Sequence, residues 1–157
     1  MKDVRVQQGD FDVSAELASL RAQDPRIGAV VSFVGTVRDM NDGASVSEME
    51  LEHYPGMTEQ ALANIFEQAR ARWPLLGVTV IHRHGRLLPG DNIVLVATAS
   101  SHREAAFAAA EFLMDYLKTR APFWKKEETS AGARWVEARA SDDDAAARWR
   151  APTEPAG

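Results

Sequence analysis

Two apolar segments rich in β-branched residues place the strongest constraint on the fold of this chain. They are residues 28–37 (GAVVSFVGTV) and residues 92–99 (NIVLVATA), and the pattern predicts a buried strand for each. Residues 46–53 alternate imperfectly between apolar and polar side chains, which favours a half-exposed strand. Strands of this kind bury their apolar sides against another layer of secondary structure, and in this chain the candidates for that layer are helices.

Three segments show helical periodicity and supply those helices. They are residues 11–22, residues 58–73 and residues 102–120. We expect Asp12 or Ser14 to cap the first helix, and Ser100 and Ser101 to cap the third. Pro74 stops the second helix. The third helix carries an apolar stripe of Ala106, Ala110, Leu113, Met114 and Leu117.

The remaining segments complete a β-α-β-β-α-β-β-α-β-β order. Strands are predicted at residues 4–7 and 78–86, a loop at 38–45, and a hairpin that joins 123–129 to 134–138. Because hairpins outnumber parallel crossovers, the fold class is α+β with a largely antiparallel sheet. We expect residues 1–150 to form one domain that ends in a short helix at 142–150, and residues 151–157 to form a disordered tail.

The charge balance and the lack of cysteine exclude several function classes. A formal net charge of -5 argues against a nucleic-acid-binding module. With no cysteine, the chain has no disulfide, thiolate metal site or cysteine nucleophile, so any sulfur that it handles must arrive on another molecule. The N-terminal residues lack the apolar core of a secretion signal and no apolar run is long enough to span a bilayer, so we expect a cytoplasmic protein.

Residues 116–127 (YLKTRAPFWKKE) concentrate positive charge in this acidic protein. Proline disfavours a helical conformation at the residue before it, so Pro122 places Lys118 at a helix end and Lys125 on the segment that turns back. Two lysines on two elements can converge on one anion, and a lysine with a lowered pKa can act as an acid, base or nucleophile. The alternative is a solvated basic helix end that complements the helix dipole.

Other basic residues are candidates for anion binding. His102 and Arg103 open the third helix, where free backbone N–H groups favour an anion, although a polar first turn is the alternative. Arg38 follows a strand at a loop mouth, where Gly35 would permit close backbone approach, or it is an ordinary surface arginine. His102 and Lys118 are ~24 Å apart along one straight helix, so either the pocket is elongated, or long side chains span part of it, or a second subunit contributes.

Two further segments have weaker patterns. His82 and His84 alternate on a strand, but no third ligand of suitable spacing is visible, so we interpret them as structural or surface histidines and expect no metal site. Arg139 ends the stretch RWVEAR and either reaches a neighbour's pocket or is an exposed strand end. Motifs of nucleotide-binding loops and serine hydrolases are absent from the sequence.

Several segments of the chain are long and unusual in combination. They are GAVVSFVGTVRD, LEHYPGMTE, RWP, VIHRHGRLLPGD, SSHREAAF, MDYLKTRAPFWKKE and RWVEARASD. Through these segments, from about residue 28 to residue 149, the chain resembles the large, catalytic subunit of molybdopterin synthase. The resemblance implies an α/β hammerhead fold with an added antiparallel sheet.

The resemblance also implies an activity and an assembly. Members of this family convert a cyclic pyranopterin monophosphate into molybdopterin by installing two sulfurs as a dithiolene. The sulfur comes from the thiocarboxylated C-terminal glycine of a small ubiquitin-like subunit, whose tail enters a pocket of the large subunit. Two large subunits form a central homodimer with one small subunit at each end, a heterotetramer. This sulfurtransferase of molybdenum cofactor biosynthesis needs no resident cofactor.

Carried over position by position, the resemblance assigns catalysis to Lys118 and Lys125. The matched substrate-binding positions are Arg38, His102, Arg103, the pocket-wall residues Phe33 and Met114, and Arg139, which the other protomer donates. An alternative of a different class is a non-catalytic scaffold that binds the C-terminal tail of a small ubiquitin-like protein. The same cations would serve it, but it would perform no chemistry on a pterin.

Overall fold

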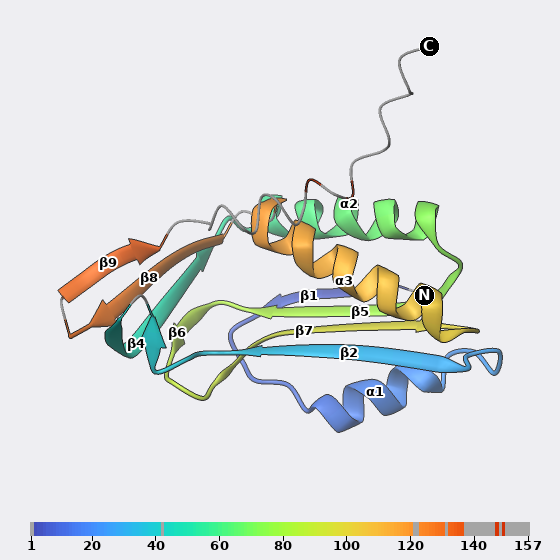
Figure 1. Ribbon diagram of the computed structural model, residues 1–157, viewed down its shortest axis with the longest axis horizontal. Helices are drawn as coiled ribbons and strands as arrows, with labels where there is room; N and C mark the ends of the chain where they lie inside the picture. The colour runs from blue at the N-terminus through green and yellow to red at the C-terminus, as the bar shows by residue number, and fades with distance from the viewer. Residues whose placement is uncertain are drawn as a thin grey trace, which may run out of the picture.

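The computed structural model describes residues 2–41, 43–120, 123–130, 132–136, 147 and 149 (Figure 1). Within this part of the chain, helices and strands follow the predicted order, with two short strands added. The predicted helix at residues 142–150 and the predicted tail at 151–157 lie outside the described residues, apart from Ala147 and Trp149.

The first sheet joins four strands in the order β1-β5-β7-β2. They are β1 (Lys2–Gln7), β5 (Leu75–Arg83), β7 (Asn92–Ser100) and β2 (Ala29–Thr36). β1 and β5 pair in parallel, whereas β5 with β7 and β7 with β2 pair antiparallel. The two central strands, β5 and β7, are buried over most of their length, as expected for strands covered on both faces.

β2 lies at an edge of this sheet and corrects one prediction. The strand itself is confirmed, but it is not uniformly buried, because Phe33 is 41% exposed. Its apolar, β-branched sequence does not distinguish a central strand from an edge strand whose apolar side chains face outward. In the described part of the chain, β2 pairs only with β7.

The second sheet is centred on β4 (Ala44–His53) and β8 (Phe123–Thr129), which pair antiparallel. β9 (Gly132–Val136) forms the predicted hairpin with β8. β3 (Met40–Asn41) and β6 (Gly85–Leu87) also pair with β4. The predicted loop at 38–45 is therefore partly a hairpin, and the predicted strand at 78–86 is two strands divided at His84, next to Gly85 with a φ of 91°.

A β-bulge explains why the alternation along β4 is imperfect. Val46 and Met49 are both buried although they are three residues apart, and the register with β8 shifts between Val46 and Glu48. A bulge inserts one extra residue and so changes which side chains face the core. After the bulge, Met49 and Leu51 are buried in regular alternation and Glu50 is exposed.

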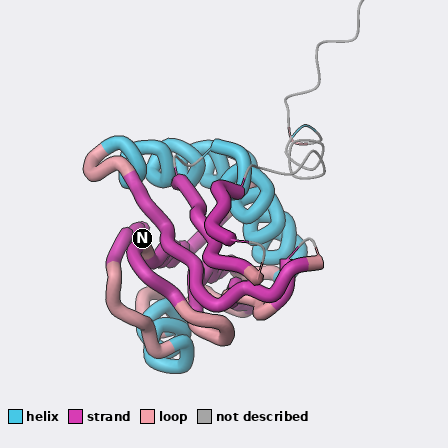
Figure 2. Tube along the Cα trace, turned by 90° about the vertical axis from the view of Figure 1, so that its left-hand side faces the viewer, coloured by secondary structure: helices cyan, strands magenta, loops and turns pink. Residues whose placement is uncertain are grey.

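Three helices cover the first sheet in the described structure. α2 (Met57–Arg72) and α3 (Arg103–Arg120) lie on one face, and α1 (Val13–Arg21) lies on the other (Figures 1 and 2). Asp12 is the N-cap of α1, as predicted, since its side chain accepts a hydrogen bond from the Ala15 N–H. None of the described helices is both long and apolar enough to cross a membrane.

The apolar stripe of α3 packs into the main core, which holds this helix in place. Phe112 and Leu113 are buried against α2 and the sheet residues Val94 and Val96. The Thr98 hydroxyl donates to the carbonyl of Ala106 at 2.6 Å, which ties the first turns of α3 to β7. The position of the C-terminal end of α3 is therefore set by core packing.

Ser100 does not act as predicted at the start of α3. It is the last residue of β7, and its hydroxyl donates to the Pro74 carbonyl at 2.8 Å. The capping prediction is thus wrong for Ser100 and stays a prediction for Ser101.

Gly28 allows the close approach of two backbone segments, and this gives a test of the fold. A methyl group at Gly28 would fall well inside contact distance of the Ser101 carbonyl oxygen, whereas one at Gly9 would meet nothing within 4 Å. We expect Gly28→Ala to lower the free energy of unfolding by about 1–3 kcal/mol and Gly9→Ala to change it by less than about 0.5 kcal/mol. Urea denaturation of both variants measures the difference, and equal stabilities would contradict this packing.

Candidate functional site

Lys118 and Lys125 lie on two elements that meet at one end of the molecule. Lys118 is in the last turn of α3 and is exposed, and Lys125 is the third residue of β8. Only residues 121 and 122 separate the two elements, so the chain turns back at once after α3 (Figure 1). The prediction of one lysine on a helix end and one on the returning segment is confirmed.

The surroundings of Lys125 show that the cations converge. Its side chain is 32% exposed, and its amine lies 3.7 Å from a carboxylate oxygen of Glu127, whose side chain is buried. Burial is the largest influence on the Lys125 amine and lowers its pKa. Glu127 opposes this shift, while the positive charges of Lys118 and Arg38 lower the pKa further. Cations from α3, from β8 and from the connection that follows β2 therefore act on one another here.

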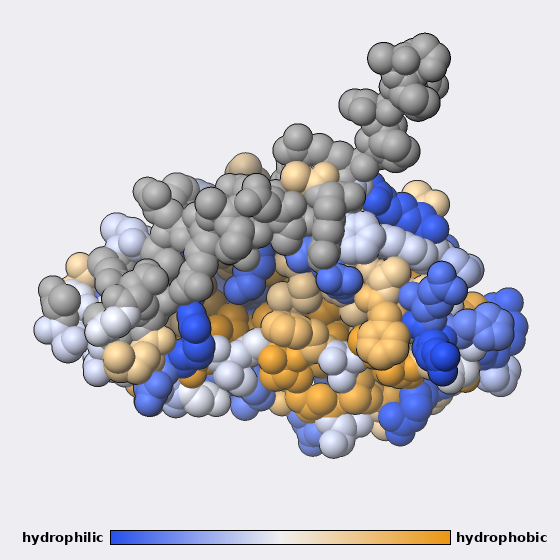
Figure 3. Space-filling view, viewed as in Figure 1, coloured by the Kyte–Doolittle hydropathy of each residue, from blue (hydrophilic) through white to orange (hydrophobic). Residues whose placement is uncertain are grey.

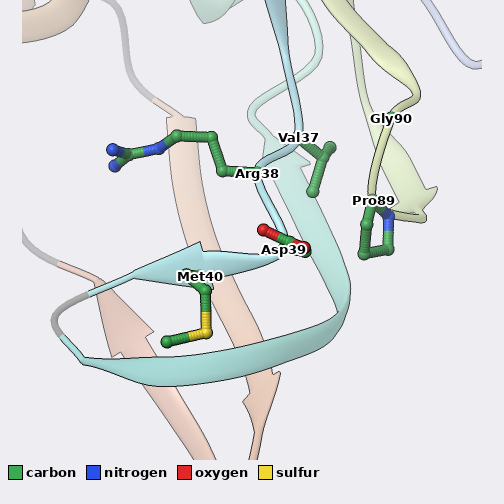
Figure 4. A pocket seen from close by; sticks show the side chains of 6 residues that line it. All are labelled: Val37, Arg38, Asp39, Met40, Pro89 and Gly90. Carbon is green, nitrogen blue, oxygen red and sulfur yellow. The ribbon is translucent and has the colours of Figure 1, made fainter.

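Arg38 belongs to the connection between the two sheets. Val37 donates its N–H to the Asp91 carbonyl and accepts from the Gly90 N–H at 2.8 Å, so this connection is held against the turn at Pro89 and Gly90. An open pocket is lined by Val37, Arg38, Asp39, Met40, Pro89 and Gly90. The Arg38 side chain extends from it toward the side where β8 begins (Figure 4). The exposed guanidinium can thus reach an anion held beside Lys125.

Phe33 lies on β2 beside α3, and Met114 is part of α3 itself. Phe33 shares the face of the sheet that carries Val94 and Val96, and Met114 is half-buried against the main core. A methyl group at Gly35 would come within 2.8 Å of Val94 Cγ1 and 3.3 Å of the Phe33 ring. Gly35 therefore makes room for two side chains, and not for the close backbone approach that we expected.

His102 and Arg103 lie at the opposite end of α3 from Lys118. Both are exposed, and the 15 residues from Arg103 to Lys118 correspond to about 22 Å of helix. One chain therefore does not bring these two residues to the lysines (Figure 1). Arg139 lies outside the described residues, so its assignment stays a prediction.

The histidines form a cluster that the sequence pattern did not reveal. His82 is buried, and its ring stacks on Phe123 with the ring centroids 3.7 Å apart and the planes 17° apart. The rings of His53 and His84 are 4.2 Å apart, and His53 lies 3.7 Å from Glu59. The pattern placed His82 and His84 on one strand, but β5 ends at Arg83, so His84 lies beyond it.

The pKa of His82 is lowered to about 4, and burial is the largest cause. Its hydrogen bond to Arg83 opposes the shift, and the neighbouring charges of Lys118, His53 and His84 add to it. His82 is therefore a neutral ring under the influence of Lys118 at neutral pH. Across the described residues, no group of three or more His, Asp or Glu side chains is arranged to hold a metal ion.

Comparison with known proteins assigns the family. The model of the family described as MoaE protein matches residues 6–120. The chain belongs to the MoaE family. A Ralstonia nicotianae relative named molybdopterin synthase catalytic subunit is 65% identical over 156 residues, which are 99% of this chain and 89% of that protein. The resemblance inferred from the sequence, to an enzyme of molybdenum cofactor biosynthesis, is confirmed.

Solved MoaE structures confirm the α+β fold. The MoaE protein from Burkholderia ambifaria is 60% identical, covers 95% of this chain and 98% of its own, and has a TM-score of 0.82. A Helicobacter pylori structure, described as a complex of subunits 1 and 2 of molybdopterin-converting factor, is 20% identical with a TM-score of 0.71. It covers 87% of this MoaE chain and 91% of its own, and it shows likeness of fold alone.

The buried His82 makes the stability of this MoaE chain sensitive to acid. Its pKa is lower in the folded protein than in the unfolded chain, so below pH ~6.5 the unfolded chain takes up the proton first. The contribution of His82 to the free energy of unfolding is therefore fully present above pH ~6.5. It falls by about 3 kcal/mol as the pH drops toward 4.

Urea denaturation between pH 7.5 and 4 tests this expectation with a matched pair of variants. His82→Phe should lose less stability on acidification than the wild type, because it carries no titrating group. His102→Gln removes an exposed histidine and should follow the wild-type curve. Parallel curves for the wild type and His82→Phe would contradict the assignment.

Proposed function

We propose that this chain installs sulfur on a cyclic pyranopterin monophosphate, taking it from the thiocarboxylated C-terminus of a small ubiquitin-like subunit. The meeting of Lys118, Lys125 and Arg38 at one end of the fold is the observation that carries the proposal. The catalytic-subunit name of the 65% identical relative supports it.

The chemistry of these side chains suits the proposed reaction. The thiocarboxylate and the substrate phosphate are both anions, and ammonium and guanidinium groups bind anions and stabilise charge that develops as sulfur attacks. The lowered pKa of Lys125 brings its amine closer to exchanging a proton near neutral pH. Lys118 and Lys125 hold the thiocarboxylate and move protons, and catalysis is mostly positioning and charge stabilisation.

A shared site between two copies accounts for the residues that one chain keeps apart. Arg103, at the start of α3, lies about 22 Å from Lys118, near the end of that helix. A neighbouring copy would therefore bring the start of its own α3 to the lysines of this chain. The edge strand β2 and the exposed Phe33 and Phe107 offer an apolar surface for such a copy (Figure 3). In this arrangement, His102, Arg103 and the partner-donated Arg139 anchor phosphate and pterin, with Phe33 and Met114 at the pocket wall.

The proposed assembly is a heterotetramer of two such chains and two small sulfur-carrying subunits. The complex named for the Helicobacter pylori relative supports a two-subunit enzyme. We place the reaction in the cytoplasm. No resident cofactor is needed, because the partner brings the sulfur and the pterin is the substrate.

Lys125 and its neighbour Lys126 provide a matched test. They project from opposite sides of β8, and the Lys126 amine lies 5.9 Å from the centre of the exposed Trp135 ring. With thiocarboxylated small subunit and cyclic pterin phosphate, we expect Lys118→Ala and Lys125→Ala to lower dithiolene formation about 100-fold or more. Lys126→Ala should remain close to wild type.

Three outcomes of this assay separate the possibilities. Wild-type turnover in Lys118→Ala would refute its catalytic role. Equal losses of turnover in Lys125→Ala and Lys126→Ala would show that turnover depends on the total positive charge and not on the position of Lys125. A folded wild-type complex that binds the partner but forms no product would favour the scaffold.

Sharing of the site between protomers predicts complementation. Arg139→Ala and Lys118→Ala are each expected to be inactive, but a mixed dimer contains one site with both residues intact. Mixing the two variants should therefore recover part of the wild-type activity. Mixed dimers verified by mass spectrometry that show no recovery would contradict the shared site.

A further inference from the structure

His82 is close enough to Lys118 for its charge to act on the ring, and a backbone contact holds the ring in place. It belongs to β5 of the first sheet, is 6% exposed, and its Nδ1 is 2.8 Å from the carbonyl oxygen of Arg83. A carbonyl oxygen only accepts hydrogen bonds, so Nδ1 carries the proton of the neutral ring. This hydrogen bond restrains the rotation of the ring.

The ring of His82 contacts the residue at which the second sheet resumes after α3. Phe123 is the first residue of β8, and its ring stacks on His82 at 3.7 Å. Lys125 follows two positions later on the same side of the strand, and Lys118 is the third residue from the end of α3. The stack therefore lies at the junction between the two lysines and joins the two sheets.

We propose that His82 is a positioning residue that sets the spacing between the amines of Lys118 and Lys125 by holding Phe123 at the start of β8. The inference rests on the proposed function for its catalytic meaning, but the geometry that it describes is independent of that function.

The choice of histidine suits this place. A flat ring stacks on Phe123, and the Nδ1 proton satisfies the Arg83 carbonyl. Burial and the positive charge of Lys118 keep the ring neutral, so it adds no repulsion to the cations around it.

The proposal is tested on two variants of His82 with two separate measurements. The first measurement is the pKa of Lys125, which is obtained by competitive labelling with acetic anhydride across a range of pH, followed by mass spectrometry. The second is dithiolene turnover by the reconstituted complex. In His82→Ala we expect the pKa of Lys125 to rise toward its ordinary value and turnover to fall about ten- to a hundred-fold, because a misplacement of about 1 Å has such an effect. In His82→Phe, which keeps a stacking ring, both should stay close to wild type.

Leu20→Ala is the matched control for lost stability. Leu20 is fully buried on the α1 side of the sheet, away from β8, so its truncation should destabilise the fold and leave the pKa of Lys125 unchanged.

An unchanged Lys125 pKa in His82→Ala would overturn the proposal. So would equal losses of turnover in His82→Phe and His82→Ala, which would assign the role to the ring nitrogens. If the wild type forms no product, the proposed function is rejected. The pKa of Lys125 measured by labelling would still show whether His82 positions this lysine.

Discussion

The pairing of β8 with β4 is the interaction on which the site depends. α3 packs on the first sheet, and β8 joins the second sheet directly after it, so this pairing determines where the returning chain lies. Its register places Lys125 opposite Leu51, on the buried side of the sheet, and Lys126 opposite Glu50, on the exposed side. A slip of one residue would exchange the two lysines and remove the site.

The same pairing produces the electrostatic character of the site. Carrying Lys125 toward the interior removes part of its hydration, and the nearby charges of Lys118 and Arg38 add repulsion. The buried carboxylate of Glu127 compensates in part, which allows the amine to remain there. An anion that binds at this place would relieve the repulsion between the cations. The positive charge at this place is local, since the formal net charge of the whole protein is -5.

Local patterns predicted most of the fold because helices and long strands are encoded by periodicity. The break at Pro122 also sufficed to predict that Lys118 and Lys125 lie on adjoining elements. The short strands β3 and β6 were missed, since they exist only through pairing with β4. The exposure of β2 was missed for a related reason, because the position of a strand within a sheet is not a local property.

The part of the site that depends on contacts between the sheets could not be predicted. The stacking of His82 on Phe123 joins residues 41 positions apart in the chain, and no spacing rule relates them. The separation of His102 and Arg103 from Lys118 was expected from helix length alone. The role of Arg139 came from family resemblance and not from a physical pattern.

In the proposed reaction, Lys118 and Lys125 act as one unit on one anion. The first measurement to make is a double-mutant cycle on single-turnover dithiolene formation, with wild type, Lys118→Ala, Lys125→Ala and the double variant. Residues that act as a unit are strongly non-additive, so the double variant should be scarcely slower than the slower single variant. If the two single losses multiply in the double variant, the lysines act independently and do not form one unit.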